Sequence, residues 1–200
     1  MRPRKPYHHG HLREVLLQAA IRLIAEVGPA GFTLREVARR AGVSHNAPYR
    51  HFPDREGLLV AVAEQGFLEL NQAMLAAAAK EPRAIDQLKC AGLAYVEFAL
   101  RRPEHFTVMF DSPAAKPKTP DSSEAAQAFG TLVRLVKGAQ AEKHLPNGDL
   151  GEFTLLAWSM VHGVAKLATA NRLPYKSKAD ILKFAGFVID QSLPVRRPKT

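Results

Sequence analysis

The apolar residues near the start of the chain recur at helical spacing. Over residues 10–27 an apolar side chain returns every three or four positions, which places these side chains on one face of a helix. Gly28-Pro29 then ends the helix, because glycine readily adopts the closing conformation and proline cannot continue it. The predicted face contains Leu12, Val15, Leu16, Ala19, Ala20, Leu23, Ile24 and Val27.

A pair of shorter helices is predicted over residues 33–52. Thr33 and Glu36 have the spacing of a capping box, so a helix is expected to begin just after Thr33. Gly42 can take a positive φ and end that helix. Ser44 can then cap a second helix. Two short helices joined by a tight turn containing glycine make a helix-turn-helix, which places its second helix in the major groove of DNA.

The rest of the chain continues the helical pattern. Asp54 can cap a helix that runs through an alanine-rich stretch to about Lys80. Polar and β-branched residues never alternate over a useful length, so no strand is predicted. We therefore expect an all-α protein with a small basic head, residues 1–57, and a larger apolar body, residues 58–200. Further helices are expected near residues 84–101, 103–111, 121–142, 149–170 and 177–191.

The charge distribution favours an anionic partner for the head. The net charge is +9, and residues 1–57 hold 10 of the 28 Lys and Arg but 5 of the 19 Asp and Glu. Charge alone does not separate nucleic acid from an acidic membrane. No apolar run approaches the ~20 residues that span a bilayer. The single cysteine, Cys90, forms no intrachain disulfide, which fits a reducing compartment. We expect a cytoplasmic protein with no membrane partner.

Polar side chains crowd the second helix of the predicted helix-turn-helix. None of them is needed for a core, and the arginines of the preceding helix, Arg35, Arg39 and Arg40, can face phosphates. The alternative is an ordinary helical hairpin with solvated charges. The cap, the glycine corner and the polar second helix together favour DNA binding. The polar residues are His45, Asn46, Tyr49, Arg50 and His51.

Several motifs resemble the TetR family of transcriptional regulators. Residues 7–13, the motif Thr33–Phe52 and the segment His51–Leu59 together resemble the DNA-binding head of that family. Residues 157–163 contain Trp158 and the pair His162-Gly163, and they resemble the Trp-His-Gly signature of one of its C-terminal domain types. The resemblance implies an all-α homodimer whose head binds DNA and whose body, residues 58–200, binds a ligand and dimerises.

The resemblance also implies roles for residues of the head. Thr33, Tyr49 and His51 fall on positions that commonly hold phosphates, and Arg55 replaces a common lysine while keeping its charge. Pro48 removes a backbone donor within the second helix, so a local irregularity is expected there. The predicted DNA-binding set is Thr33, Arg35, Ser44, His45, Asn46, Ala47, Tyr49, Arg50, His51 and Arg55.

The body contains aromatic and methionine side chains that suit an apolar cavity with a few polar handles. The predicted ligand-binding set is Tyr95, Phe98, Phe106, Met109, Phe110, Phe129, Trp158 and His162; the alternative for each is plain core packing. The body helices lack an obvious cluster of charged residues, so we expect a largely apolar effector. The predicted dimer interface is Leu155, Val161, Ala165, Ile181, Phe184 and Val188; the alternative is packing within one subunit.

The sequence favours a regulator over an enzyme. Ser159 and His162 lie one helical turn apart, but no acid completes a triad, and no metalloprotease, P-loop or dinucleotide motif is present. No cofactor or metal is expected, because no cysteine or carboxylate completes a site with His8, His9 and His11. The basic residues Arg2, Arg4 and Lys5 could contact DNA or form a solvated tail.

The predicted function is therefore a repressor on a pseudo-palindromic operator in double-stranded DNA, released when a small molecule binds. Two alternatives stay open: an activator of the same fold, and a nonspecific architectural DNA-binding protein. The second explains the charge but not the large apolar body.

Overall fold

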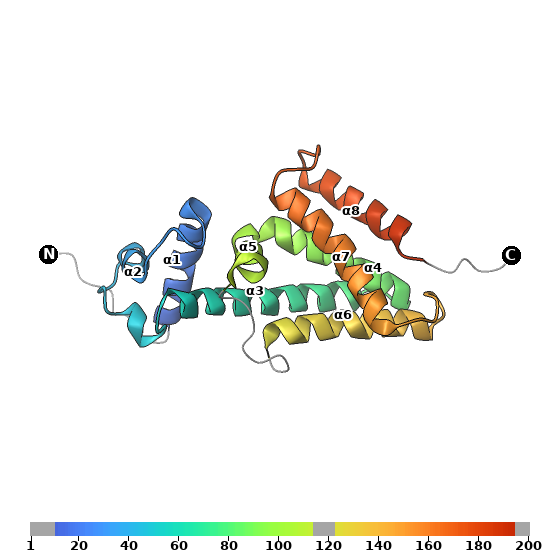
Figure 1. Ribbon diagram of the computed structural model, residues 1–200, viewed down its shortest axis with the longest axis horizontal. Helices are drawn as coiled ribbons and strands as arrows, with labels where there is room; N and C mark the ends of the chain where they lie inside the picture. Colours follow the sequence, from blue (N-terminus) through green and yellow to red (C-terminus); the bar gives the residue numbers. More distant parts are fainter. Residues whose placement is uncertain (1–10, 114–122, 195–200) are drawn as a thin grey trace. The chain divides into compact units, whose positions relative to one another are not determined.

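The computed structural model describes residues 11–113 and 123–194, and every regular element within these ranges is helical (Figure 1). The prediction of an all-α fold is confirmed. None of the described helices is both long and apolar enough to span a membrane. The elements are α1 (Leu12–Val27), α2 (Leu34–Ala41), the 3-10 helix η2 (Pro48–Arg50), α3 (Arg55–Ala78), α4 (Ala84–Arg101), α5 (Pro103–Asp111), α6 (Glu124–Ala141), α7 (Leu150–Thr169) and α8 (Lys178–Ser192).

The predicted helix bounds agree closely with the observed ones. The expected ranges 84–101 and 103–111 coincide with α4 and α5, and the later helices begin and end within three residues of expectation. Asp54 caps α3 as predicted, because its Oδ1 accepts the backbone N–H of Gly57 at 2.7 Å. Pro and Gly breaks together with capping side chains are the strongest local signals of helix ends, which accounts for the agreement.

The chain divides into two compact units, and the divisions fall inside α3 and α5. The first unit lies within residues 1–63 and 107–116. In it α2 packs against α1, and the fully buried side chains Leu16, Val37 and Leu58 come one each from α1, α2 and α3. Two of the predicted apolar residues of α1, Val15 and Val27, are exposed, because the first lies off the buried face and the second is the last residue of the helix.

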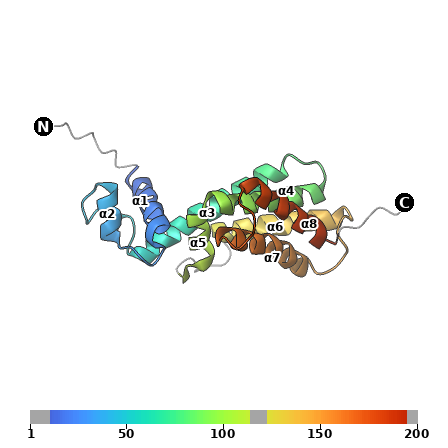
Figure 2. The same cartoon turned by 90° about the horizontal axis from the view of Figure 1, so that it is seen from above.

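The second unit lies within residues 64–106 and 117–200. Its centre is α4, which packs against α6, α7 and α8; α7 also contacts both α6 and α8 (Figures 1 and 2). Val96, Phe98 and Ala165 are among its fully buried side chains. The apolar faces of α6, α7 and α8 are buried against α4, which forms the core of this unit.

Candidate nucleic-acid interface and aromatic cluster

The start of α2 is fixed by the predicted capping box. Thr33 Oγ1 accepts the backbone N–H of Glu36 at 3.3 Å, and Glu36 Oε2 accepts the backbone N–H of Thr33 at 2.7 Å. The Thr33 hydroxyl also donates to the same carboxylate oxygen at 2.9 Å. The hydrogen bond from the Thr33 hydroxyl, and after it the one from the Thr33 backbone N–H, hold the pKa of Glu36 below its ordinary value.

The end of α2 depends on the backbone conformation of Gly42. Its φ of 70° and ψ of 30° are left-handed, and its N–H donates to Arg39 O at 3.2 Å. The next N–H, from Val43, donates to Ala38 O at 3.0 Å and closes the helix. A Cβ at position 42 would meet nothing within 4 Å, so the backbone angle and not space requires glycine there.

The predicted second helix of the motif is replaced by a turn and a single 3-10 turn. The N–H of Ala47 donates to Ser44 O at 2.9 Å, and η2 follows at Pro48–Arg50 without the expected side-chain cap from Ser44. The physical reason is Pro48, which has no N–H to donate to a preceding carbonyl and so stops an α-helical ladder from forming. The local irregularity expected at Pro48 therefore extends over residues 44–50, where the second helix of the motif was predicted.

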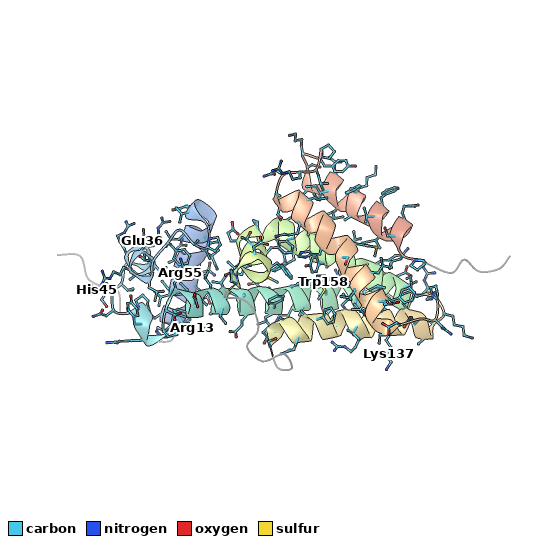
Figure 3. The ribbon with its side chains drawn as sticks, viewed as in Figure 1. Arg13, Glu36, His45, Arg55, Lys137 and Trp158 are labelled. Atoms are coloured by element: carbon cyan, nitrogen blue, oxygen red, sulfur yellow. The ribbon has the colours of Figure 1, made fainter. Side chains whose placement is uncertain are left out.

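The segment Ser44–His51, which we term the recognition segment, has one apolar and one polar side. Pro48 is buried, and Phe52, directly after the segment, is 3% exposed. Ala47 is half-buried. The remaining six side chains are exposed, with His45 labelled on the turn after α2 in Figure 3. They are Ser44, His45, Asn46, Tyr49, Arg50 and His51, so the hydrogen-bonding groups predicted to meet DNA are available at the surface.

Two of the basic residues predicted to face phosphates have partners within the head. Arg40 donates two hydrogen bonds of 2.6 Å to the carboxylate of Glu26, which joins α2 to α1. Arg55 is half-buried, and its Nη1 donates to the carbonyl of Ala30 at 2.9 Å, which holds the connection between α1 and α2. Arg35, by contrast, is exposed, as is Thr33.

One stabilising contact of the recognition segment was not predicted from the sequence. The guanidinium of Arg13 lies 5.7 Å from the ring centroid of Phe52, a cation–π geometry that joins α1 to the residue after the segment. The two residues are 39 positions apart, so no local spacing signals the contact. Arg2, Arg4, Lys5, His8 and His9 lie outside the described residues. Across residues 11–113 and 123–194, no group of three or more His, Cys, Asp or Glu is placed to hold a metal.

Replacing Thr33 by alanine is expected to lower the free energy of unfolding by about 1 kcal/mol, because it removes the side-chain cap of α2. Thr33→Ser keeps the hydroxyl and should retain most of the stability. The measurement is urea unfolding followed by circular dichroism.

This stability difference is expected to depend on pH. The folded-state pKa of Glu36 is lowered, so its stabilising contribution is present above the unfolded pKa and is lost as the pH falls through the folded value. The difference in the free energy of unfolding between the parent protein and Thr33→Ala should therefore become smaller in acid. A stability difference that stayed constant to the acid limit would show that the hydrogen bond from the Thr33 hydroxyl to the Glu36 carboxylate contributes nothing to the cap.

A second polar arrangement lies inside the body. Tyr95 of α4 is 5% exposed, and its Oη lies 2.8 Å from Nδ1 of His162 on α7. The indole N–H of Trp158, one turn earlier on α7, donates to the same phenol oxygen at 3.3 Å. Burial raises the pKa of Tyr95, so the phenol keeps its proton and can donate it to His162. In that direction Nδ1 of His162 is the acceptor, which corresponds to the tautomer of the imidazole with its proton on Nε2.

Aromatic rings from two further positions, Phe106 and Phe129, lie against this arrangement. The His162 ring lies 5.4 Å from the Trp158 ring and 5.6 Å from the Phe106 ring between centroids. Phe129 of α6 meets Trp158 edge to face at 6.1 Å. We term Tyr95, Phe106, Phe129, Trp158 and His162 the aromatic cluster; Trp158 is labelled in Figure 3. Five of the eight predicted ligand-binding residues therefore come together.

The other three predicted ligand-binding residues are Phe98, Met109 and Phe110. Phe98 is 1% exposed and belongs to the core of the second unit. Met109, which is 5% exposed, and Phe110, which is half-buried, belong to the first unit. Ser159, which lies one helical turn before His162, is exposed. The group within hydrogen-bond distance of His162 Nδ1 is the Tyr95 phenol.

The predicted interface residues differ in exposure. Leu155 is 52% exposed, Phe184 and Val188 are half-buried, and three are buried within the chain itself. The most exposed apolar side chain on α8 is Phe187, at 59%, and its ring stacks on Phe184 at 6.4 Å. Phe187 was not predicted, although it lies three positions after Phe184 and its helical spacing could have signalled it. The three buried residues are Val161, Ala165 and Ile181.

Comparison with known proteins identifies the family. Residues 16–62 match the family described as bacterial regulatory proteins, tetR family, and residues 88–191 match a domain described as tetracyclin repressor-like, C-terminal. A solved structure of a protein of unknown function from Rhodococcus sp. RHA1 is 36% identical, with a TM-score of 0.79 over 95% of this chain and 99% of that one. The protein belongs to the TetR family of transcriptional regulators.

Two more distant structures share the fold. A bacterial regulatory protein in the tetR family from Rhodococcus RHA1 is 20% identical, with a TM-score of 0.71 over 90% of this chain and 94% of that one. FadR from Bacillus subtilis, solved in complex with stearoyl-CoA, is 13% identical, with a TM-score of 0.71 over 90% of this chain and 97% of that one.

Removing the phenol oxygen with Tyr95→Phe is expected to lower the free energy of unfolding by about 1–3 kcal/mol, because the half-buried side chains of Trp158 and His162 each lose a hydrogen-bond partner. The matched control is Tyr175→Phe, since Tyr175 is 38% exposed and keeps its ring contact with Phe184. Urea unfolding followed by Trp158 emission measures both. Equal stabilities of the two variants would contradict the assigned role of the phenol.

Proposed function

We propose that this TetR-family protein is a homodimeric repressor that leaves its operator when a small, largely apolar molecule binds its body. The observation that carries the proposal is the recognition segment, with six exposed polar side chains on a buried base of Pro48 and Phe52. A segment of this kind suits hydrogen bonding to base edges and phosphates.

The head supplies both parts of DNA recognition in this proposal. Asn46 can pair with the edge of an adenine, whereas Tyr49 and His51 meet phosphates and set the register. Arg40 and Arg55 stabilise the head through Glu26 and the Ala30 carbonyl. This assignment replaces the expected phosphate contacts of Arg40 and Arg55 with a supporting role.

Dimerisation follows from the need to read a two-fold symmetric site. Symmetric half-sites require two heads related by the protein's own symmetry axis. The exposed apolar side chains on α7 and α8 include Leu155, Leu156, Leu167 and Phe187. Covering them in a dimer would remove this apolar surface from water. We assign the dimer interface to this face.

The aromatic cluster is the proposed effector site. Its rings offer apolar contact, and the Tyr95–His162 pair offers hydrogen bonding. FadR, which has the same fold, was solved with stearoyl-CoA, a ligand with a long apolar chain. Release from the operator requires that the effector bind more tightly to the conformation whose two heads do not match the spacing of the operator half-sites. Only such a difference in affinity shifts the equilibrium between the two conformations.

Selection from sheared genomic DNA tests the proposal. The purified protein should enrich one two-fold symmetric sequence over bulk DNA at physiological salt. A reporter gene placed downstream of that sequence should be transcribed less when the protein is present. Increased transcription would assign the protein as an activator, and enrichment of no sequence would leave only nonspecific binding.

A further inference from the structure

The position of the recognition segment depends on Phe52, which follows it directly. The backbone N–H groups of His51 and Phe52 both donate to the carbonyl of Pro48 at 2.9 Å, so the backbone of Phe52 is tied to η2. The Phe52 side chain is 3% exposed. A contact that holds the Phe52 ring therefore also holds the backbone that carries the exposed polar side chains of the segment.

The Phe52 ring is contacted by the exposed side chain of Arg13, which comes from α1 and is labelled in Figure 3. The guanidinium carbon lies 5.7 Å from the ring centroid, within the ~6 Å over which a cation is attracted to an aromatic face. Among the described residues no carboxylate forms an ion pair with Arg13, in contrast to Arg40, which pairs with Glu26. The charge of Arg13 therefore interacts with the ring and not with an acid.

The place of Arg13 in α1 is unfavourable for the helix itself. Arg13 is the second residue of α1, where unpaired backbone N–H groups carry partial positive charge. A cation there opposes the helix dipole, and an acidic side chain such as that of the neighbouring Glu14 suits this turn better. The contact with Phe52, and not the stability of α1, therefore accounts for an arginine at this position.

We propose that Arg13 is a positioning residue for DNA recognition, which holds the Phe52 ring against α1 and thereby fixes where the recognition segment meets the duplex. His51 is coupled most directly, because its own ring lies 6.3 Å from the Phe52 ring between centroids. Arg13 acts through Phe52 and makes no phosphate contact in this assignment. The inference rests on the proposed DNA-binding role of the recognition segment.

Arg13→Met tests this role, because methionine keeps an apolar stem and removes the charge. Affinity for the operator is expected to fall about threefold, and affinity for unrelated duplexes should fall less, since base reading needs the segment in place. Loss of a phosphate contact would instead weaken both equally and reduce the slope of log affinity against log salt by about 0.9. We expect the parent's slope. The control, Arg22→Met, removes another exposed charge from α1 and should leave the ratio of the two affinities unchanged.

A substitution of the ring separates the two roles of the arginine. Phe52→Leu keeps an apolar side chain and removes the π face. If Arg13 acts through the ring, Arg13→Met should cause no further loss of operator affinity in the Phe52→Leu background. A direct phosphate contact would give the same loss in both backgrounds. Phe52→Tyr keeps the ring, so the effect of Arg13→Met should persist there. Melting curves of each variant confirm folding.

Hydrogen exchange tests the positioning without DNA. The amides of His51 and Phe52 exchange when the turn at Pro48 opens, so Arg13→Met should speed their exchange about threefold. The amide of Ala20, buried in α1, reports the stability of the whole head and should change less. Parent-like exchange at both amides, or an equal loss of affinity on all duplexes with a reduced salt slope, would overturn the inference. Because exchange needs no operator, failure to enrich any DNA sequence would count against the proposed function alone.

Discussion

Phe187→Glu is expected to yield a monomer that binds the operator roughly 100-fold or more weakly than the parent, because a single head loses the avidity of two linked half-sites. The Phe187 ring is 59% exposed, so a carboxylate there is solvated in the monomer and should leave its fold intact. In the proposed dimer the same carboxylate would be buried without a partner, which is strongly unfavourable. Analytical ultracentrifugation and operator titration measure the two effects.

The control is an equally apolar position outside α7 and α8. Leu75 on α3 is 44% exposed, and Leu75→Glu introduces the same charge without touching the proposed interface. It should remain dimeric and bind the operator normally. A parent protein that sediments as a monomer at micromolar concentration and still binds the operator tightly would contradict the dimer assignment.

Asn46→Ala is expected to cost about 1–3 kcal/mol of binding free energy on the operator and to relax the preference for one base pair. The reason is the loss of an amide that can donate to and accept from an adenine edge. Asn46 is exposed on the turn before η2, so the change should not alter the stability of the head. Titrations against the operator and against single-base variants measure affinity and specificity together.

Phosphate contacts should give a different pattern. Tyr49→Phe and His51→Ala should weaken binding by similar factors on operator and unrelated duplexes, because phosphates carry no sequence information. If all three substitutions left operator binding at the parent level, the recognition segment would be wrongly assigned. If Asn46→Ala weakened binding uniformly on every duplex, its role would be positioning and not base reading.

The helices could be predicted from the sequence because their signals are local. Thr33 and Glu36 lie three residues apart, and Gly42 follows at the position where a left-handed residue ends α2. The sequence predicts that Pro48 makes the second helix locally irregular, but it does not predict that the α-helix is lost altogether. One missing N–H turned a short α-helix into a turn and η2, because a helix of two turns has too few other hydrogen bonds to compensate.

The contacts that could not be predicted join residues far apart in the chain. The spacing of Trp158 and His162 placed both on one face of α7, but nothing in it indicated that Tyr95 would bridge them. Arg55 carried the right charge for a phosphate, yet the fold places the Ala30 carbonyl 2.9 Å from its Nη1. Long-range partners depend on how the helices pack, and periodicity reports only the face that each helix buries.

The central claim is that two copies of this protein read a two-fold symmetric DNA sequence through the recognition segment. Footprinting of the selected sequence with the purified protein tests it most directly. We predict two protected half-sites on one side of the duplex, about one helical turn or a multiple of it apart, with protection lost in Phe187→Glu and weakened in Asn46→Ala. Uniform protection of all duplexes, unchanged in both variants, would contradict the claim.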